Sequence, residues 1–290
     1  KKDLIKITMS KEYAMKNLIT CQQLQKRLND PTLVLFDAGM LRPGVLGTYV
    51  PEAMLPNAKR FDIKNELADK SNPLSSTMCN AQQFTQVMQH AGVNHDSFIV
   101  VYEDAGLFSA ARAWWMLKAM GHHNVKVLNG GLKKWLACGY AVQQGYSEAL
   151  TCGNFEASYN PSYFIGSQQV LAAIDDANTV LLDARAYKRF TGEESEPRKG
   201  MRGGHIPQSR SLPFLDLLTD GEAKAFEEIK IKFESAVGTA EYIQFSCGSG
   251  ITACILALFA DECGYKNLSV YDGSWSEWGA SDSLPITKDV

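Results

Sequence analysis

Short apolar stretches alternate with amphipathic stretches along most of the chain. The runs Phe98–Tyr102 and Tyr242–Phe245 have the length and composition of buried strands. Between such runs, apolar residues recur at helical spacing, and Thr20 and Asn80 each stand three residues before a glutamine, a pattern typical of a helix start. Strands that alternate with helices predict an α/β fold, with mainly parallel sheets covered by helices on both faces.

The predicted elements follow the same order in both halves of the chain. We expect strands at 32–36, 98–102, 125–128, 179–182, 242–245 and 268–271. We expect helices from residue 20, at 80–92, 108–120 and 131–138, from residue 167, and at 222–233 and 251–263, with a terminal turn at 275–278.

The second half of the chain repeats the first. A shift of 143 residues superposes 104–135 on 247–278 without a gap, and it pairs Gly121 with Gly264 and Trp135 with Trp278. We therefore predict two copies of one α/β domain. The first domain is expected at 10–145, a polar linker at 146–161, and the second domain at 162–290.

Composition limits the classes of partner. The 290 residues are 45% hydrophobic, enough for two cores, and the net charge of −3 offers no basic face for nucleic acid. The longest apolar run, 253–260, is far shorter than the roughly 20 residues of a membrane span. Seven cysteines without CxxC pairs indicate a reduced, metal-free, cytoplasmic protein, although the start at Lys1 leaves a removed leader open.

Candidate chemistry concentrates at residues 241–260. An apolar strand leads to a turn that opens with Cys247, and an apolar helix follows. Gly248 and Gly250 let the backbone fold back with N–H groups pointing inward, and cysteines at helix N-termini ionise more readily than free cysteine. We expect Cys247 to be a nucleophile, the alternative being a buried structural cysteine.

The rest of the loop narrows the reaction. A cysteine phosphatase needs an arginine six residues after its nucleophile, and Ala253 stands there. A loop that holds one small atom on the sulfur favours a persulfide, and hence sulfur transfer. Ser249 and Thr252 can hydrogen-bond such a sulfur, or they can cap the following helix.

Three motifs carry a family resemblance. The loop Ser246–Ala253, together with Gly204–Pro207 and Tyr271–Trp278, resembles the rhodanese-type sulfurtransferases, in particular their mercaptopyruvate branch. The resemblance covers about residues 18–279 and implies two tandem rhodanese-like domains without a cofactor or metal. It also implies an inactive first domain, with Asp104 in the place of the nucleophile, and a structural role for His205.

The resemblance implies roles for further residues. Arg189 and Arg198 match its two substrate-arginine motifs, and Arg185 is a weaker candidate whose alternative is an internal salt bridge. The loop positions implied to bind substrate with them are Gly248, Gly250, Ile251 and Thr252. Some relatives are proposed to couple Ser249 to an Asp and a His of the first domain. Asp62 matches the Asp, but 72–80 contains no histidine.

The sequence therefore predicts an enzyme that moves sulfur from 3-mercaptopyruvate through a Cys247 persulfide to an acceptor, releasing pyruvate. The acceptor is expected to be a thiol, a thioredoxin-like protein or cyanide. The neutral Gly248 and Ser249 favour this donor over thiosulfate, whose users carry cations there. A thiosulfate sulfurtransferase and a non-catalytic persulfide carrier are the alternatives.

Overall fold

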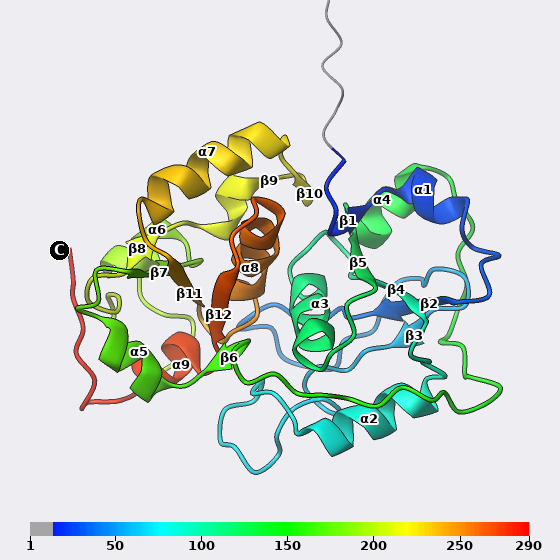
Figure 1. Ribbon diagram of the computed structural model, residues 1–290, viewed down its shortest axis with the longest axis horizontal. Helices are drawn as coiled ribbons and strands as arrows, with labels where there is room; N and C mark the ends of the chain where they lie inside the picture. The colour runs from blue at the N-terminus through cyan, green and yellow to red at the C-terminus, as the bar shows by residue number, and fades with distance from the viewer. Residues whose placement is uncertain (1–13, 290) are drawn as a thin grey trace, which may run out of the picture.

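The chain forms two α/β units, each built on a five-stranded parallel sheet (Figure 1). The computed structural model describes residues 14–289. The strand order is β1-β5-β4-β2-β3 in one sheet and β6-β12-β11-β7-β8 in the other, which is the same topology. The strands of the first sheet are β1 (Leu18–Ile19), β2 (Leu33–Asp37), β3 (Lys59–Arg60), β4 (Phe98–Tyr102) and β5 (Val125–Leu128). Those of the second are β6 (Phe164–Ile165), β7 (Thr179–Asp183), β8 (Arg210–Ser211), β11 (Tyr242–Ser246) and β12 (Asn267–Tyr271).

Helices flank both sheets, as the alternating pattern predicts. In the first unit they are α1 (Cys21–Gln25), α2 (Ala81–His90), α3 (Ala110–Ala119) and α4 (Gly131–Ala137). In the second they are α5 (Ser167–Ala173), α6 (Tyr187–Thr191), α7 (Phe226–Val237), α8 (Ala253–Glu262) and α9 (Ser274–Trp278). A 3-10 helix (Phe214–Leu217) leads into a hairpin of β9 (Leu218–Thr219) and β10 (Glu222–Ala223).

Local sequence signals explain where several helices begin. The Thr20 hydroxyl accepts from the N–H of Gln23, whose side chain accepts from the N–H of Thr20, so the predicted capping box is confirmed. The predicted helix at 222–233 is wrong at its start, because residues 222–223 form β10 and α7 begins at Phe226. Gly221, at φ +82°, makes the hairpin turn that sets β10 against β9.

The side chains of β4 show why both faces of the sheet need cover. All five residues of this strand are buried. Ile99 and Val101 belong to the core that α3 shares, whereas Val100 and Tyr102 face the opposite cluster with α1 and α4. A central parallel strand that is apolar on both sides requires helices on both sides, so the predicted fold class is confirmed.

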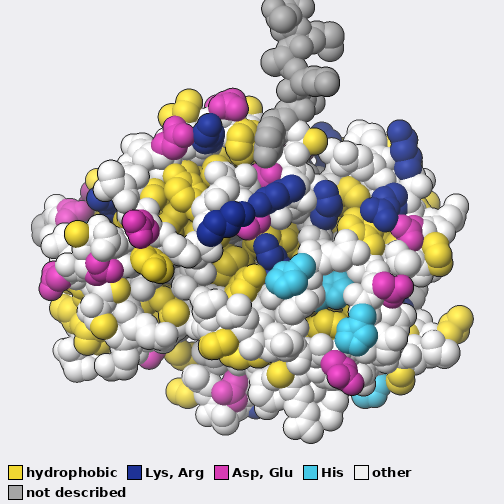
Figure 2. Space-filling view, in the orientation of Figure 1, with side chains coloured by type: hydrophobic (Ala, Val, Ile, Leu, Met, Phe, Trp, Pro, Cys, Tyr) yellow, Lys and Arg dark blue, Asp and Glu magenta, His cyan; other side chains and the backbone are white. Residues whose placement is uncertain are grey.

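One hydrophobic core runs through both units. Helices α3 and α8 pack against each other at the centre of the molecule (Figure 1). Trp115 of α3 donates to the Tyr163 carbonyl 3.0 Å away. Nearby, Lys16 and Lys118 both pair with Asp261, at 3.1 and 3.5 Å, and Figure 2 shows basic side chains gathered across the middle of this face. The two units therefore form one packed body.

The segment 146–161 connects the units without forming a helix or strand. It runs along the first unit past α2 (Figure 1). Phe155 is buried, and its N–H donates to the Val93 carbonyl at 3.1 Å; the Ser158 N–H donates to the Met120 carbonyl at 3.0 Å. Within residues 14–289 no helix is long and apolar enough to cross a bilayer.

Candidate active site

Cys247 directly follows β11 at the carboxyl edge of the second sheet, and the loop 247–252 joins it to α8. This edge is where open α/β sheets place their ligands. The side chain of Cys247 is only 1% exposed. Gly250 adopts φ +74°, and a Cβ there would lie 2.6 Å from the Asp272 carbonyl oxygen, so only glycine fits this turn.

Two carbonyl groups of the loop accept hydrogen bonds from residues of α9. The Trp275 N–H donates to the Cys247 carbonyl at 2.9 Å. The Ser276 N–H and hydroxyl donate to the Gly248 carbonyl at 2.9 and 2.6 Å. The Cys247 N–H donates to the Ser274 hydroxyl at 3.1 Å. These contacts fix the loop from outside.

The backbone N–H groups of residues 248–252 remain free. In the described part of the chain, none of these five donates to a protein acceptor. Thr252 stands at the N-cap of α8 but makes no side-chain capping bond. Backbone donors are strongly disfavoured in a buried loop unless an acceptor faces them. The loop therefore presents a set of N–H donors without protein acceptors directly after Cys247.

Arg189 and Arg198 lie together at the mouth of this loop. They line one cleft with Gly248 and Ser249. A Cβ placed on Gly248 would be 3.4 Å from Nη2 of Arg189, and Arg198 donates to the hydroxyl of Ser276. The structure thus brings two guanidinium groups beside the loop, within the second domain.

Glu196 holds Arg189 in place, a role that the sequence analysis missed. Arg189 donates to both oxygens of this buried carboxylate, with its Nε 3.3 Å from Oε1, and Arg185 pairs with Oε1 at 2.8 Å. Arg185 is itself buried, binds Asp183 at 2.7 Å and stacks over Trp275. It makes the internal salt bridge that was its alternative role, so it supports the cleft and does not line it.

His205 has structural contacts. Its Nδ1 lies 3.0 Å from the Phe190 carbonyl, its ring stacks on Phe190, and its backbone pairs with Thr287. The side chain is 5% exposed. These contacts order the loop before β8.

Asp62 does not reach the cysteine loop. Its carboxylate accepts from the Lys64 N–H at 3.2 Å and from the backbone and side chain of Asn65 at 2.9 Å. Burial alone would raise the pKa of Asp62, but these hydrogen bonds and the charge of Arg60 hold it below its usual range. Within residues 14–289 no hydrogen bond or ion pair joins Asp62 to Ser249. The contacts of Asp62 are those of a local turn.

The first domain supplies the other wall of the cleft. The loop 73–77 faces Arg198 and Ser249 across a space of about 200 Å³, and Pro43 lines an adjoining space of about 40 Å³ with Arg189 and Arg198. Arg112 of α3 crosses the interface fully buried and binds Asp272 at 2.7 Å, the Gly250 carbonyl at 3.1 Å and the Ser76 carbonyl at 2.7 Å. The first domain therefore touches the backbone of the cysteine loop.

Arg112 was missed by the sequence analysis, although a signal was present. It is the one charged residue in the run Ala110–Leu117. A guanidinium inside an apolar helix cannot lose its charge and requires buried partners. The sequence could have revealed that need, but not the partners, which lie up to 160 residues away at Asp272.

In the first domain, an acidic residue occupies the position that is equivalent to Cys247. Asp104 stands there, beside a buried Glu103 whose pKa burial raises to about 8, and Arg42 lies 2.8 Å from Glu103 and 3.4 Å from Asp104. The β9–β10 turn covers this loop so closely that a Cβ on Gly106 would meet the Gly221 carbonyl at 2.5 Å. The first domain therefore has a carboxylate and no thiol at this place.

Fold and site together define a tandem-domain protein with a cysteine loop in its second copy only. The family model described as "Rhodanese-like domain" matches residues 20–138 and 167–281. The 3-mercaptopyruvate sulfurtransferase of Escherichia coli (strain K12) is 37% identical over 268 residues, or 91% of this chain and 95% of that protein. The thiosulfate sulfurtransferase of Mus musculus is 36% identical over 255 residues, or 86% and 85%.

A solved structure agrees with these sequence matches. The crystal structure of an Escherichia coli 3-mercaptopyruvate sulfotransferase superposes with a TM-score of 0.80 at 33% identity, covering 89% of this chain and 98% of that one. The chain belongs to the rhodanese family, and the resemblance predicted from its motifs is confirmed. The two relatives named above, which the chain matches over 95% and 85% of their length, are sulfurtransferases.

Proposed function

We propose that this protein transfers sulfur from 3-mercaptopyruvate through a Cys247 persulfide. The observation that carries the proposal is the set of five N–H groups at 248–252 that lack protein acceptors and directly follow a buried cysteine. Such preorganised donors stabilise negative sulfur in a site from which water is excluded, an effect worth about 2.7–4 kcal/mol per donor at an oxyanion hole.

In the first half-reaction, the Cys247 thiolate attacks the substrate sulfur. The new S–S bond forms as the C–S bond breaks, and the electron pair leaves on carbon as the enolate of pyruvate. A proton from solvent converts the enolate to pyruvate. We assign the substrate carboxylate to Arg189 and Arg198, since guanidinium groups bind carboxylates through paired N–H donors.

The remaining predicted site residues follow from the same chemistry. Ser249 lines the cleft and donates to the substrate or the persulfide. Gly248, Gly250, Ile251 and Thr252 act through backbone N–H groups. The contacts of Asp62 favour a structural role for it over a relay to Ser249. A thiol, a thioredoxin-like protein or cyanide then removes the outer sulfur.

The raised pKa values of four other thiols support the selective reaction of Cys247. Burial raises the pKa of Cys79 to about 11 and that of Cys21, Cys254 and Cys263 to about 12, which keeps these groups protonated. All seven cysteines are free, which supports the proposal of a reducing, cytoplasmic location.

Thiosulfate is the second candidate donor, because one relative is a thiosulfate sulfurtransferase. The loop argues against it here. Thiosulfate and its leaving group sulfite are dianions, and the positions beside the nucleophile are the neutral Gly248 and Ser249. A persulfide carrier without turnover is the third candidate.

One experiment separates the three candidates. Initial rates with 3-mercaptopyruvate and with thiosulfate are measured in parallel, with cyanide as acceptor, and pyruvate is followed for the first donor. We expect a higher kcat/KM for 3-mercaptopyruvate by orders of magnitude. Faster turnover of thiosulfate would replace the proposed donor, and a single burst of pyruvate without turnover would indicate a carrier.

A further inference from the structure

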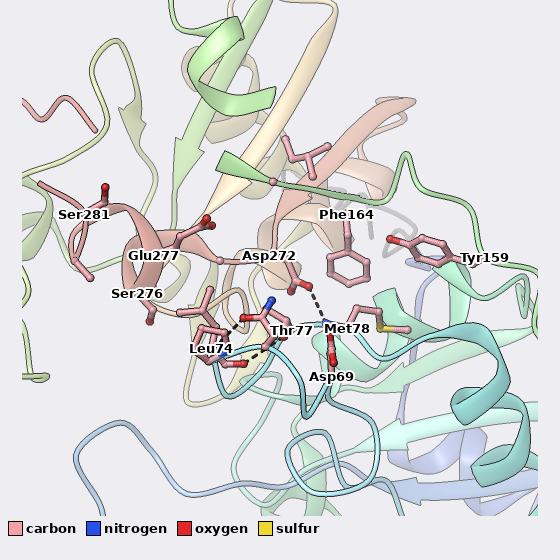
Figure 3. Close-up of a pocket in the computed structure, with 16 residues that line it drawn as sticks. Asp69, Leu74, Thr77, Met78, Tyr159, Phe164, Asp272, Ser276, Glu277 and Ser281 are labelled. Atoms are coloured by element: carbon pink, nitrogen blue, oxygen red, sulfur yellow. Dashed lines mark hydrogen bonds between the residues drawn. The ribbon is translucent and has the colours of Figure 1, made fainter. Parts of the chain in front are cut away.

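A second, larger cavity lies between the domains next to the proposed donor site (Figure 3). Its volume is about 620 Å³, within the range of small-ligand sites. It shares Asp272, Gly273 and Ser276 with the cleft that Ser249 and Arg198 line. The two spaces therefore adjoin at the first turn of α9, which holds the loop of Cys247. The proposed donor chemistry uses only one of them.

The two spaces differ in charge. The donor end carries Arg189 and Arg198, and Lys64 stands close enough for burial and the charge of Arg198 to lower its pKa. The larger cavity is lined by carboxylates and by no Lys, Arg or His. An anionic donor is therefore attracted to the arginines and repelled from the larger cavity.

Two of the carboxylates have no cationic partner in the described part of the chain. Asp272 is neutralised by Arg112 at 2.7 Å. Asp69 accepts from the N–H and hydroxyl of Ser71, and these neutral donors lower its pKa despite the opposing effect of desolvation. Glu277 likewise accepts only from hydroxyls, at 2.8 Å each. The cavity is thus lined by two carboxylates, Asp69 and Glu277, without a Lys, Arg or His beside them in its lining.

Apolar side chains form the rest of the wall. Leu74 and Met78 come from the first-domain loop, whereas Tyr159 and Phe164 come from the chain that enters the second domain. Figure 3 shows Phe164 and Met78 facing one another across the cavity, with Asp69 below. This combination suits a short carbon chain that carries a positive group.

We propose that this cavity binds the sulfur acceptor, and that the acceptor is a small thiol with a cationic ammonium group. The inference rests on the proposed persulfide at Cys247. The acceptor thiolate attacks the outer sulfur, a new S–S bond forms, and the Cys247–S bond breaks with its electron pair returning to the cysteine. The outer sulfur keeps its hydrogen, and the product is the aminothiol persulfide.

The test follows the second half-reaction alone. Protein is loaded with 3-mercaptopyruvate, freed of excess donor, and checked for one added sulfur atom by intact mass. It is then mixed with cysteamine or with 3-mercaptopropionate, two thiols of similar size and opposite charge. The ratio of the two discharge rates is compared between wild type and variants, so the different reactivities of the two thiols cancel.

Asp69→Asn and Glu277→Gln are each expected to lower the ratio of cysteamine to 3-mercaptopropionate about thirty-fold. A charge roughly 8 Å from the ligand in an effective dielectric of about 40 changes each rate about five-fold, and the two rates change in opposite directions. Glu241→Gln is the matched control, because it removes an exposed carboxylate at the opposite end of β11. It should leave the ratio unchanged. Added salt should reduce the wild-type ratio.

Two results would overturn the inference in different ways. If Cys247 loads normally but the ratio is the same in wild type, Asp69→Asn and Glu277→Gln, the cavity does not receive the acceptor. If Cys247 never gains a sulfur atom, the proposed function fails and the acceptor site fails with it. A ratio that falls equally in Glu241→Gln would show a general surface-charge effect, which also contradicts a specific site.

Discussion

Replacing Arg112 with methionine should show whether the first domain supports catalysis in addition to stabilising the fold. The side chain is fully buried and reaches from α3 to Asp272 and to the carbonyls of Gly250 and Ser76. Methionine keeps an apolar side chain of similar length over Phe164, which the guanidinium now covers at 4.4 Å. The change therefore removes the charge and the donors while it fills most of the space.

The expected loss of stability is about 3 kcal/mol. Removal of one partner of a buried ion pair costs about 3–5 kcal/mol. The lower end applies here, because the Asp272 side chain is 15% exposed and still accepts from the Met78 N–H at 2.8 Å. The loss should shrink in Arg112→Met with Asp272→Asn, since no uncompensated charge then remains.

The expected effect on catalysis is a fall in kcat of up to about 100-fold, the size of effect that a misplacement of about 1 Å can cause. The Gly250 carbonyl loses its donor, so the loop N–H groups are no longer fixed around the sulfur. KM should change little, because Arg189 and Arg198 are held by Glu196 and Ser276 within the second domain.

The chain offers a matched control for this experiment. The Ala223 N–H donates to Asn129 Oδ1 at 2.9 Å. Asn129 is the repeat equivalent of Asp272 in the first domain, so this contact corresponds to that of the Met78 N–H with Asp272. Asn129→Val should lower stability by about 1–3 kcal/mol without changing kcat. Urea unfolding and steady-state kinetics are measured for all variants. If folded Arg112→Met has the same kcat as Asn129→Val, Arg112 only stabilises the fold. The same conclusion follows if Arg112→Met with Asp272→Asn recovers both its stability and its kcat.

Three further predictions concern the second domain. Cys247→Ser should abolish turnover and the addition of sulfur seen by intact mass; an adduct of the same mass in this variant would place the nucleophile elsewhere. Arg189→Ala and Arg198→Ala should each raise KM for 3-mercaptopyruvate about ten-fold or more with little change in Tm, and lysine should rescue only part; normal KM in both would contradict carboxylate binding. Gly248→Arg with Ser249→Lys should raise kcat/KM for thiosulfate and lower it for 3-mercaptopyruvate, since a Cβ on residue 248 meets Arg189 at only ordinary contact distance; an unchanged ratio would show that loop charge does not set donor choice.

Patterns along the chain were sufficient to predict most of the strands and helices, the repeat and the cysteine loop. Each depends on information that is local in the chain: the five apolar residues of β4, the capping box at Thr20, or the glycines that follow Cys247. Periodicity, caps and turn chemistry act over a few residues, so they can be seen without the fold. The same local reasoning failed at 222–223, where pairing with β9 overrides the helical pattern.

Which residues meet at the cleft could not be predicted before the folded arrangement was known. Arg112 reaches Asp272, Glu196 divides its carboxylate between two arginines, and Asp62 turns back on its own loop. These outcomes depend on how α3 and α8 pack and on where each polar side chain finds a partner once it is buried. A buried charge must be compensated, but the compensating group can lie anywhere in the chain, and only packing brings the two together.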